Sequence, residues 1–247
     1  LADDEASARD LVRRALEGKY PLRALGRRPT DGLESVAADI RDAIAIRPAF
    51  ADVDCVVHLA AALPSKGSTG QHLIDANVTG TYNVFEAARE AGVKRIVFAS
   101  SGAVISGWER EPPYAGLVSG NDEDRPASWP LLTHETPLRP GGLYGYTKAW
   151  GELLGRSYAD QHGLSVLSVR IGHVTACDRP EALPRSHSIW CSQRDVVQLI
   201  VRCIEAPPSL RFDIFYAASR NELGYRDLEH AREIVGYVPQ DAAEDGR

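Results

Sequence analysis

Apolar runs short enough to form strands alternate with longer segments of helical periodicity along most of the chain. Strand-like runs lie at 21–25, 35–38, 54–61, 95–102, 164–171 and 212–217, and helix-like segments lie at 7–19, 42–50, 71–91, 193–205 and 225–235, with one more that follows the glycines at 141–142 and reaches Tyr158. Consecutive parallel strands need a crossover about as long as a helix, and such crossovers are right-handed. The alternation therefore predicts an α/β fold, a doubly wound parallel sheet covered by helices on both faces.

Composition narrows the class of protein and of partner. The 247 residues are 44% hydrophobic and 25% charged, which suits one globular domain with at most a small annex. A net charge of −6 without a basic tract argues against a nucleic acid or an anionic membrane as partner. No apolar run reaches the length of a membrane span and no secretory leader is recognised, so we expect a cytoplasmic protein.

Cysteine and histidine spacing gives no metal-binding pattern. The four cysteines are scattered without a Cys-x-x-Cys pair, and the seven histidines show no ligand spacing. This arrangement is typical of reduced cytosolic thiols. We therefore predict that the protein has no metal site.

A turn that runs into a helix carries the chemistry of greatest interest. Gly141 and Gly142 break the preceding structure, and Tyr144 and Lys148 stand four residues apart on the helix that follows, so they leave from one side. An ammonium near a phenol favours the phenolate and lowers its pKa, which suits proton exchange with a hydroxyl or a carbonyl. The alternative is an ordinary surface Tyr–Lys pair.

The run Arg95–Gly102 reads as a buried strand that ends in two hydroxyl side chains, Ser100 and Ser101. Together with Tyr144-x-x-x-Lys148 it resembles the short-chain dehydrogenase/reductase superfamily, and most closely the extended branch of NAD-dependent epimerases and dehydratases. The resemblance implies a Rossmann fold, NAD or NADP as cofactor, and Ser101, Tyr144 and Lys148 as the catalytic set. Ser100 is the alternative register for the serine.

The same resemblance implies further cofactor contacts along the chain. Asp39 and Ile40 would lie by the adenine, small residues after the strand at 54–61 would let the backbone approach, and Asn77 would support the site from within a helix. Asn77 has either such a buried role or an ordinary place facing solvent. The implied cofactor-binding set is Asp39, Ile40, Leu59, Ala60, Ala61, Asn77, Ser100, Tyr144, Lys148 and Ile171. His58, within the strand, is interpreted as a core histidine.

Two arginines bear on the choice of nicotinamide. Enzymes that use NAD usually carry an acidic residue after the second strand, where this chain has Arg27 and Arg28. Guanidinium groups suit a 2′-phosphate, so this pair favours NADP, and the alternative is two solvated loop charges. The prediction stays NAD or NADP.

The phosphate-binding turn of a dinucleotide fold is not found in the sequence. Its first strand and glycine turn should precede the helix at 7–19, where the chain has Asp3, Asp4 and Glu5. Carboxylates would repel a pyrophosphate there. The chain also has no methionine and does not begin with one. We expect that a strand and a turn, about 15–20 residues, are missing from this sequence; the alternative is that the phosphate cradle has been lost.

Within the family the chain is most similar to uronate dehydrogenases, through Phe98–Ser101, Gly142–Lys148, Val169–Gly172 and an Arg…Ser-x-Trp segment at 185–190. The resemblance implies that Arg185 binds a substrate carboxylate, as a bidentate guanidinium can. The implied substrate-binding set is Ser101, Gly102, His173 and Arg185. The chain departs from the pattern at Gly102, where an asparagine is expected, and at His173, where a serine is expected. Arg185 is alternatively a surface arginine.

These features give a domain plan and a predicted activity. We expect one Rossmann-type domain over 1–247, with 1–165 mainly for the cofactor, 172–192 and 218–247 on the substrate side, and 106–136 as a lid-like insertion packed down by Trp108, Tyr114 and Trp129. The alternative for the insertion is a surface decoration or an oligomer contact.

The predicted function is NAD(P)-dependent hydride transfer on a hydroxyl or carbonyl of a sugar or sugar acid, with an anionic sugar or polyol as the substrate. A sugar epimerase or dehydratase, and a non-catalytic Rossmann protein, are the alternatives. Family members often pair through the helix that carries the tyrosine and lysine, so we expect a homodimer or a higher homo-oligomer.

Overall fold

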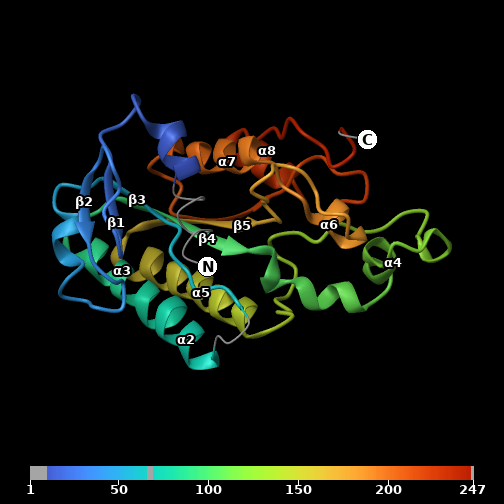
Figure 1. Cartoon of the computed structure of the whole chain (residues 1–247), viewed down its shortest axis with the longest axis horizontal. Helices are drawn as coiled ribbons and strands as arrows, with labels where there is room; N and C mark the ends of the chain where they lie inside the picture. Colours follow the sequence, from blue (N-terminus) through green and yellow to red (C-terminus); the bar gives the residue numbers. More distant parts are fainter. Residues whose placement is uncertain (1–9, 66–68, 246–247) are drawn as a thin grey trace. The chain divides into compact units, whose positions relative to one another are not determined.

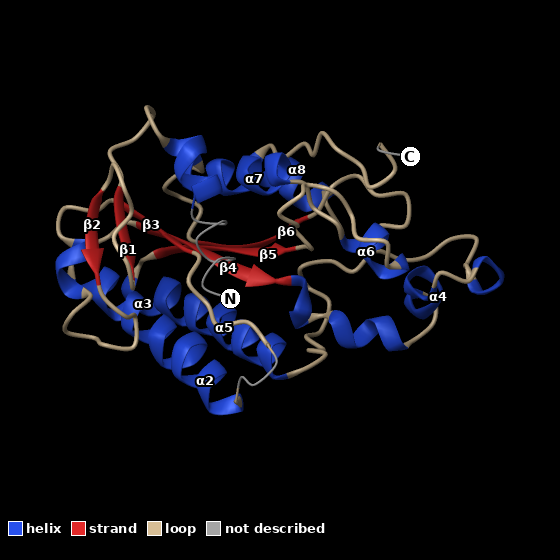
Figure 2. Cartoon of the chain, viewed as in Figure 1, coloured by secondary structure: helices blue, strands red, loops and turns tan. Residues whose placement is uncertain are grey.

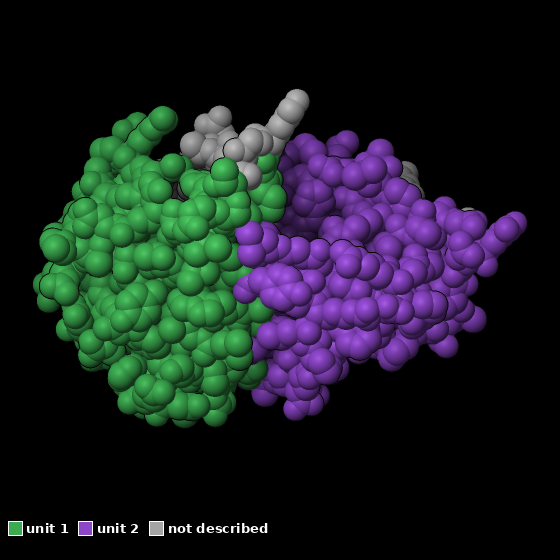
Figure 3. Space-filling view, turned by 90° about the horizontal axis from the view of Figure 1, so that it is seen from below, with its two compact units in different colours: residues 1–99, 147–168, 207–213 green, residues 100–146, 169–206, 214–247 purple. Residues whose placement is uncertain are grey.

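The structure, a computed structural model, describes residues 10–65 and 69–245. The chain divides into two compact units (Figure 3). Unit 1 comprises Leu1–Ala99, Thr147–Ser168 and Pro207–Asp213, and unit 2 comprises Ser100–Tyr146, Val169–Ala206 and Ile214–Arg247. The predicted single Rossmann-type domain over 1–247, with 1–165 mainly for the cofactor, stays a prediction. The chain divides at several points because three strands and one long helix each continue from one unit into the other.

Helices and strands in the first part of the chain follow the predicted alternation closely. Residues 10–16 are helical, as predicted for the described part of 7–19. The elements that follow are β1 (Arg23–Gly26), β2 (Glu34–Ala37), the 3₁₀ turn η1 (Arg47–Phe50), β3 (Cys55–His58), α2 (Gly70–Ile74), the π-helical η2 (Asp75–Thr79), α3 (Gly80–Glu90) and β4 (Arg95–Ser101) (Figure 1).

The second part of the chain contains more short elements than the sequence predicts. These elements are η3 (Gly102–Val104), η4 (Ser106–Arg110), α4 (Tyr114–Ser119), η5 (Asp122–Asp124), α5 (Leu143–His162), β5 (Ser165–Ile171), α6 (Pro184–Ile189), α7 (Gln193–Glu205), β6 (Phe212–Ala217) and α8 (Glu229–Val235). The ranges of α7 and β6 match their predictions to the residue.

The strands form a parallel pair, β1–β2, and a parallel four-stranded sheet in the order β3–β4–β5–β6 (Figure 2). A doubly wound sheet has the order 3-2-1-4-5-6. The pair β1–β2 corresponds in number to its strands 2 and 3, and the group β3–β6 corresponds to its strands 4, 5 and 6 with one strand more. This confirms the predicted fold class. The expected gap in the sequence, the first strand and its glycine turn, concerns the region of residues 1–9, which lies outside the described residues.

The core of unit 1 joins α3 and α5 to β4. The ring of Phe85 on α3 meets Phe98 on β4 at 6.1 Å and Tyr158 on α5 at 5.3 Å, both edge-on. Gly151 lets α5 approach this strand, since a Cβ there would collide with the Phe98 ring. Burying a ring of this size contributes about 1.5–3 kcal/mol. The packing fixes α5, and with it every side chain of that helix, against the sheet.

The predicted helix at 71–91 is interrupted by one π-helical turn, Asp75–Thr79. Asn77 lies at the centre of this turn, where its side chain hydrogen-bonds the backbone of Ala62 in the loop after β3. A residue inserted into a helix for such a contact produces a π-bulge, which is frequent at functional sites. The periodicity of the apolar residues did not show the insertion because it comes from a contact with the loop after β3, which the spacing of apolar residues does not report.

The insertion at 106–136 is packed by its aromatic residues. Tyr114 is buried, Trp108 Nε1 donates to the Pro137 carbonyl at 3.0 Å, and Trp129 Nε1 donates to the Gly224 carbonyl at 2.9 Å. These contacts agree with the predicted packing role of the aromatics. The proposal that the segment acts as a lid stays a prediction.

The predicted helix at 225–235 begins only at Glu229. The residues before it pair with the insertion instead: Leu132 and Arg226 form a β-bridge, Leu132 N donates to the Tyr225 carbonyl at 2.7 Å, and Asp227 N donates to the Leu132 carbonyl at 3.0 Å. The prediction was wrong there because this pairing holds 225–227 extended. As a result, the residues before and after Arg226 are both hydrogen-bonded to the backbone of Leu132, which fixes the backbone of Arg226.

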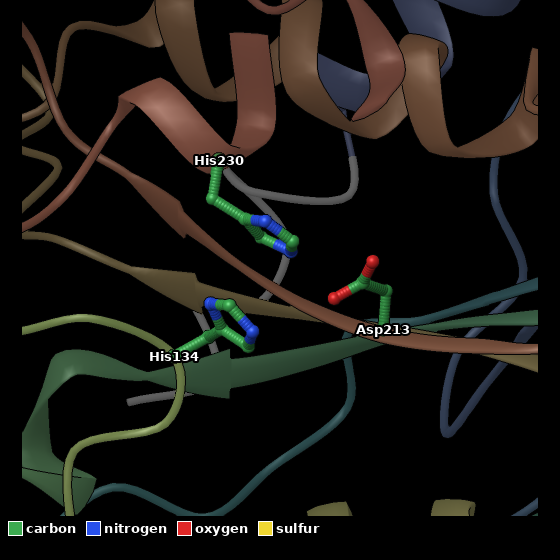
Figure 4. Close-up of side chains that lie close together, drawn as sticks. All are labelled: His134, Asp213 and His230. Carbon is green, nitrogen blue, oxygen red and sulfur yellow. The ribbon is translucent and has the colours of Figure 1, made fainter. Parts of the chain in front are cut away.

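One stack of rings in unit 2 joins α8 to the insertion. Figure 4 shows the imidazoles of His134 and His230 facing each other. Their ring centroids are 3.8 Å apart, and the ring of Phe215 on β6 is also stacked with His230, at a centroid distance of 5.4 Å. Asp213, which the figure also labels, belongs to unit 1. The stack is explained by packing, and the predicted absence of a metal site stays a prediction. None of the helices described here is long and apolar enough to span a membrane.

Candidate active site

Ser101 and Tyr144 are brought together within unit 2. Ser101 ends β4 and caps the short η3 turn, where its hydroxyl accepts from Ala103 N at 3.1 Å. Tyr144 is the second residue of α5, and its phenol is hydrogen-bonded with the Ser101 side chain. The predicted partnership of this serine and this tyrosine is therefore present.

The pKa of Tyr144 moves in the opposite direction from the prediction. Burial raises it to about 12, and the hydrogen bond with Ser101 offsets only part of the rise. A buried phenol loses the water that would stabilise its phenolate. The expected lowering by Lys148 is wrong for the protein without ligands, in which Tyr144 is protonated at neutral pH.

Lys148 lies in unit 1, one helical turn beyond Tyr144 along α5. Its side chain is buried, Nζ donates to the Ala99 carbonyl at 2.8 Å, and the ammonium lies 5.1 Å from the centre of the Phe98 ring. A lysine held by a backbone carbonyl and an aromatic face keeps a fixed position. It is not an ordinary surface lysine, so the alternative considered from the sequence is excluded for this residue.

Asn77 has the buried role rather than the solvent-facing one. Its side chain is 2% exposed, accepts from Ala62 N at 2.6 Å and donates to the Ala62 carbonyl at 2.9 Å. It also donates to Thr147 Oγ1 at 3.1 Å. Because Thr147 precedes Lys148, this network links the loop after β3 to the helix that carries the lysine.

The candidates for the adenosine half lie at the carboxyl ends of β1 and β2. Asp39 is held by Arg41 through two side-chain hydrogen bonds of 3.0 and 2.8 Å, and that contact lowers the pKa of Asp39. Ile40 packs on Gly80 at the start of α3. A shallow surface hollow is lined by Asp39, Arg41, Asp42, Ala43 and Ile44. Arg27 and Arg28 follow β1 and are exposed.

The remaining cofactor candidates lie at or just after the carboxyl ends of β3, β4 and β5, and their side chains range from half-buried to buried. In unit 1, Leu59 and Ala60 are half-buried and Ala61 is buried, directly after β3. In unit 2, Ser100 is buried and Ile171, at the end of β5, is half-buried. His58 is a core residue as predicted: it is 4% exposed and its Nε2 lies 3.1 Å from Thr81 Oγ1.

Arg185, the predicted anion-binding residue, already has a carboxylate partner. Its Nε and Nη2 lie 2.5 and 2.9 Å from the two oxygens of Glu109, and the Tyr225 hydroxyl donates to Glu109 at 2.6 Å. Burial alone would lower the pKa of Arg185, but the bonds and charge of Glu109 raise it. His173 Nδ1 lies 3.0 Å from Ser186 Oγ.

Two residues in this region were not found from the sequence. Glu109 was missed because it belongs to no recognised sequence motif. Arg226 looked like part of a helix, and its guanidinium lies where a Cβ on Gly102 would be. The one available signal was Gly102 itself, which departs from the asparagine expected after the serine. A glycine at that place indicates that something occupies the space beside it.

Comparison with known proteins agrees with this geometry. Residues 8–194 match the family model described as "NAD dependent epimerase/dehydratase family". The chain is 36% identical to NAD-dependent glucose-6-phosphate dehydrogenase of Haloferax volcanii, over 90% of this chain and 85% of that protein. It is 34% identical to L-arabinose 1-dehydrogenase (NAD(P)(+)) of the same organism, over 92% and 90%.

A solved structure is also similar over nearly the whole chain. A mutant of uronate dehydrogenase from Agrobacterium tumefaciens, complexed with NAD, is 32% identical with a TM-score of 0.78, covering 95% of this chain and 81% of that one. The family resemblance read from the serine, tyrosine and lysine is thereby confirmed. The chain belongs to the NAD-dependent epimerase/dehydratase family.

Proposed function

We propose that the protein is an NAD(P)-dependent oxidoreductase that transfers hydride between nicotinamide and a hydroxyl or carbonyl of a sugar or sugar acid. The observation that carries the proposal is the hydrogen bond between Ser101 and Tyr144, with Lys148 buried one turn further along the same helix. The activities named for the relatives, on uronates, glucose 6-phosphate and L-arabinose, support this class of substrate.

The residues present fit a dinucleotide. The hollow that Asp39 and Ile44 line follows β2, and the small residues Ala60 and Ala61 follow β3, both at strand ends where ligands bind in such sheets. Asn77 fixes the backbone just beyond them through Ala62. When bound, the nicotinamide would accept or supply the hydride. The buried ammonium of Lys148 would hold its ribose.

Tyr144 would exchange the proton at its phenol oxygen. In oxidation the phenolate takes the proton of the substrate hydroxyl, and the carbon that bears this hydroxyl loses a hydride to the nicotinamide. In reduction the phenol returns a proton to the carbonyl oxygen. Because burial raises the pKa of Tyr144 to about 12, the protonated form dominates at neutral pH. Oxidation should therefore become faster as the pH rises, and reduction slower.

Ser101 would stabilise the substrate oxygen. Its hydroxyl is fixed by Ala103 N on one side and by Tyr144 on the other. A donor fixed in this way stabilises charge that develops on the oxygen without having to reorganise. Gly102 and His173 would line the same side, and Arg185 would reach a substrate carboxylate only by exchanging its bonds to Glu109.

We assign the protein to the cytoplasm, which is supported by four cysteines that form no disulfide with one another. A homodimer is supported by apolar side chains left exposed on the helices of unit 1, notably Tyr82 at 47% and Leu153 at 63%. The insertion at 106–136 is proposed as the cover of the substrate.

The proposal is tested by mixing the purified protein with NAD or NADP and a panel of uronates, sugar phosphates and neutral sugars, and following reduced nicotinamide. Net reduction with at least one sugar is expected. An epimerase would convert sugars without net reduction, and a non-catalytic protein would do neither. Either of those results would overturn the proposal.

A further inference from the structure

Arg226 is a buried cation, with 5% of the residue exposed, and among the side chains that the structure describes it has no ion-pair partner. Its Nε and Nη1 are buried atoms without a hydrogen-bond partner among the described residues. The nearest aromatic contact is the Tyr225 ring, whose centroid is 5.7 Å from Cζ. An arginine in this state costs several kcal/mol unless an anion joins it.

The chain is built to hold this guanidinium in place. The β-bridge between Leu132 and Arg226 fixes the backbone. On the side-chain side, a Cβ on Gly102 would collide with the guanidinium, and a Cβ on Gly172 would lie 3.2 Å from Nη1. Gly102 therefore leaves the space that the arginine fills, whereas a Cβ on Gly172 would first meet the carbonyl oxygens of Ile189 and Ala217. The position of the guanidinium is specified by the fold and is not a chance orientation of a long side chain.

The place of the guanidinium relates it to the reaction. Gly102 directly follows Ser101, whose hydroxyl is bonded with Tyr144, and Gly172 directly follows β5. The carboxyl ends of strands are where α/β sheets bind ligands. The missing anion is therefore expected from a molecule that lies against Ser101.

We propose that Arg226 binds the anionic group of the substrate, a carboxylate or a phosphate carried by a sugar. This inference rests on the proposed function and assigns the anion to a residue other than Arg185. The guanidinium of Arg185 is already occupied by Glu109 through two bonds, whereas Arg226 has free donors in a buried place. A planar guanidinium can bind either anion through two parallel bonds.

The test compares three sugars that share one ring: glucuronate, glucose 6-phosphate and glucose. For Arg226→Met, kcat/KM should fall about 100-fold on the anionic substrate that the wild type prefers and change less than about threefold on glucose. Arg226→Lys should recover only part of the loss, because the charge remains without the planar pair of donors. Arg232→Met, an exposed arginine paired with Glu229 on α8, is the matched control.

A binding measurement without turnover guards against a variant that folds poorly. Glucuronate or glucose 6-phosphate should raise the melting temperature of the wild type and not that of Arg226→Met. Gly102→Ala provides a second route, since its methyl group must displace the guanidinium and should reduce the preference for the anion while the charge remains.

The outcomes separate the two proposals. Equal losses on glucose and on the anionic sugar, or ligand stabilisation that survives Arg226→Met, would overturn the assignment of Arg226. If no sugar is oxidised by the wild type but an anionic sugar still stabilises it through Arg226, the anion site stands and the proposed function fails. The preferred anion, carboxylate or phosphate, follows from which wild-type kcat/KM is larger.

Discussion

The polar groups near Lys148 and the guanidinium of Arg226 differ in how many of their hydrogen bonds the protein itself supplies. In unit 1 the lysine, Asn77 and Thr147 are each held by a bond of 2.6–3.1 Å to a backbone group or to each other. In unit 2 Arg226 is similarly buried, but its Nε and Nη1 have no hydrogen-bond partner among the residues that the structure describes. Two buried cations in one chain thus differ in whether the protein itself completes their bonding.

The difference indicates what each region is for. A completed network fixes a side chain in advance, which suits the repeated binding of one cofactor and the positioning of a proton donor. An incomplete network leaves a buried charge whose hydrogen bonds only a ligand can complete. Such a charge would let a binding site discriminate between substrates with and without a matching group. On the proposed assignment of these residues, the cofactor side would be organised before binding, and the substrate side would supply selectivity.

The largest effect is expected where proton transfer itself is removed. Tyr144→Phe deletes the hydroxyl and keeps the ring, so turnover should fall about 10²–10⁴-fold while cofactor still binds. Steady-state rates and a cofactor titration by fluorescence measure the two parts. Turnover that stays near the wild-type value would remove Tyr144 from the mechanism.

The next effect contrasts two arginines of unit 2. Arg185→Met leaves Glu109, whose side chain is only 10% exposed, without its cation, so the melting temperature should fall. Arg226→Met removes an unpaired buried charge, so the melting temperature should stay level or rise. Thermal unfolding of both variants measures this, and a larger loss for Arg226→Met would mean that its role is structural.

A smaller effect tests the completed network. Asn77→Ala leaves the N–H and carbonyl of Ala62 unpaired, at a cost of about 1–3 kcal/mol for each buried group left so. Asn221→Ala is the matched control, because Asn221 likewise bonds two backbone groups, the Trp190 carbonyl and Ala243 N. Urea unfolding should show similar losses, but only the Asn77 variant should lose cofactor affinity. Equal cofactor affinity in the two variants would limit Asn77 to a structural role.

A last effect appears only at acid pH and is absent near neutrality. Burial, with the charge of Lys148, lowers the pKa of His58 to about 3, whereas an unfolded histidine titrates near 6.5. Between these values the unfolded chain binds more protons, so stability is complete above about pH 6.5 and falls by about 1.4 kcal/mol per unit as the pH drops toward 3. His58→Gln should flatten that slope in urea unfolding at several pH values. A slope unchanged by the substitution would contradict this account of His58.

The features that could be predicted from the sequence were those that follow a periodic pattern or match a known motif. Periodicity located most strands and long helices, and the hydroxyls after β4 with Tyr144 and Lys148 located the catalytic candidates. The sequence did not predict the π-turn at Asn77 or the late start of α8, because both come from contacts with residues far along the chain. The Glu109–Arg185 pair and Arg226 were missed for the same reason. The direction of the Tyr144 pKa was wrong because burial, which is not visible in spacing, outweighs the expected charge effect.

The most direct test of the account follows the hydride itself. Glucuronate carrying deuterium at C1 is incubated with the purified protein and NAD or NADP, and the nicotinamide is analysed by mass spectrometry. One deuterium is expected in the reduced nicotinamide and none at that carbon of the oxidised product. Deuterium that stays in the sugar, with no label on the nicotinamide, would contradict the proposed hydride transfer.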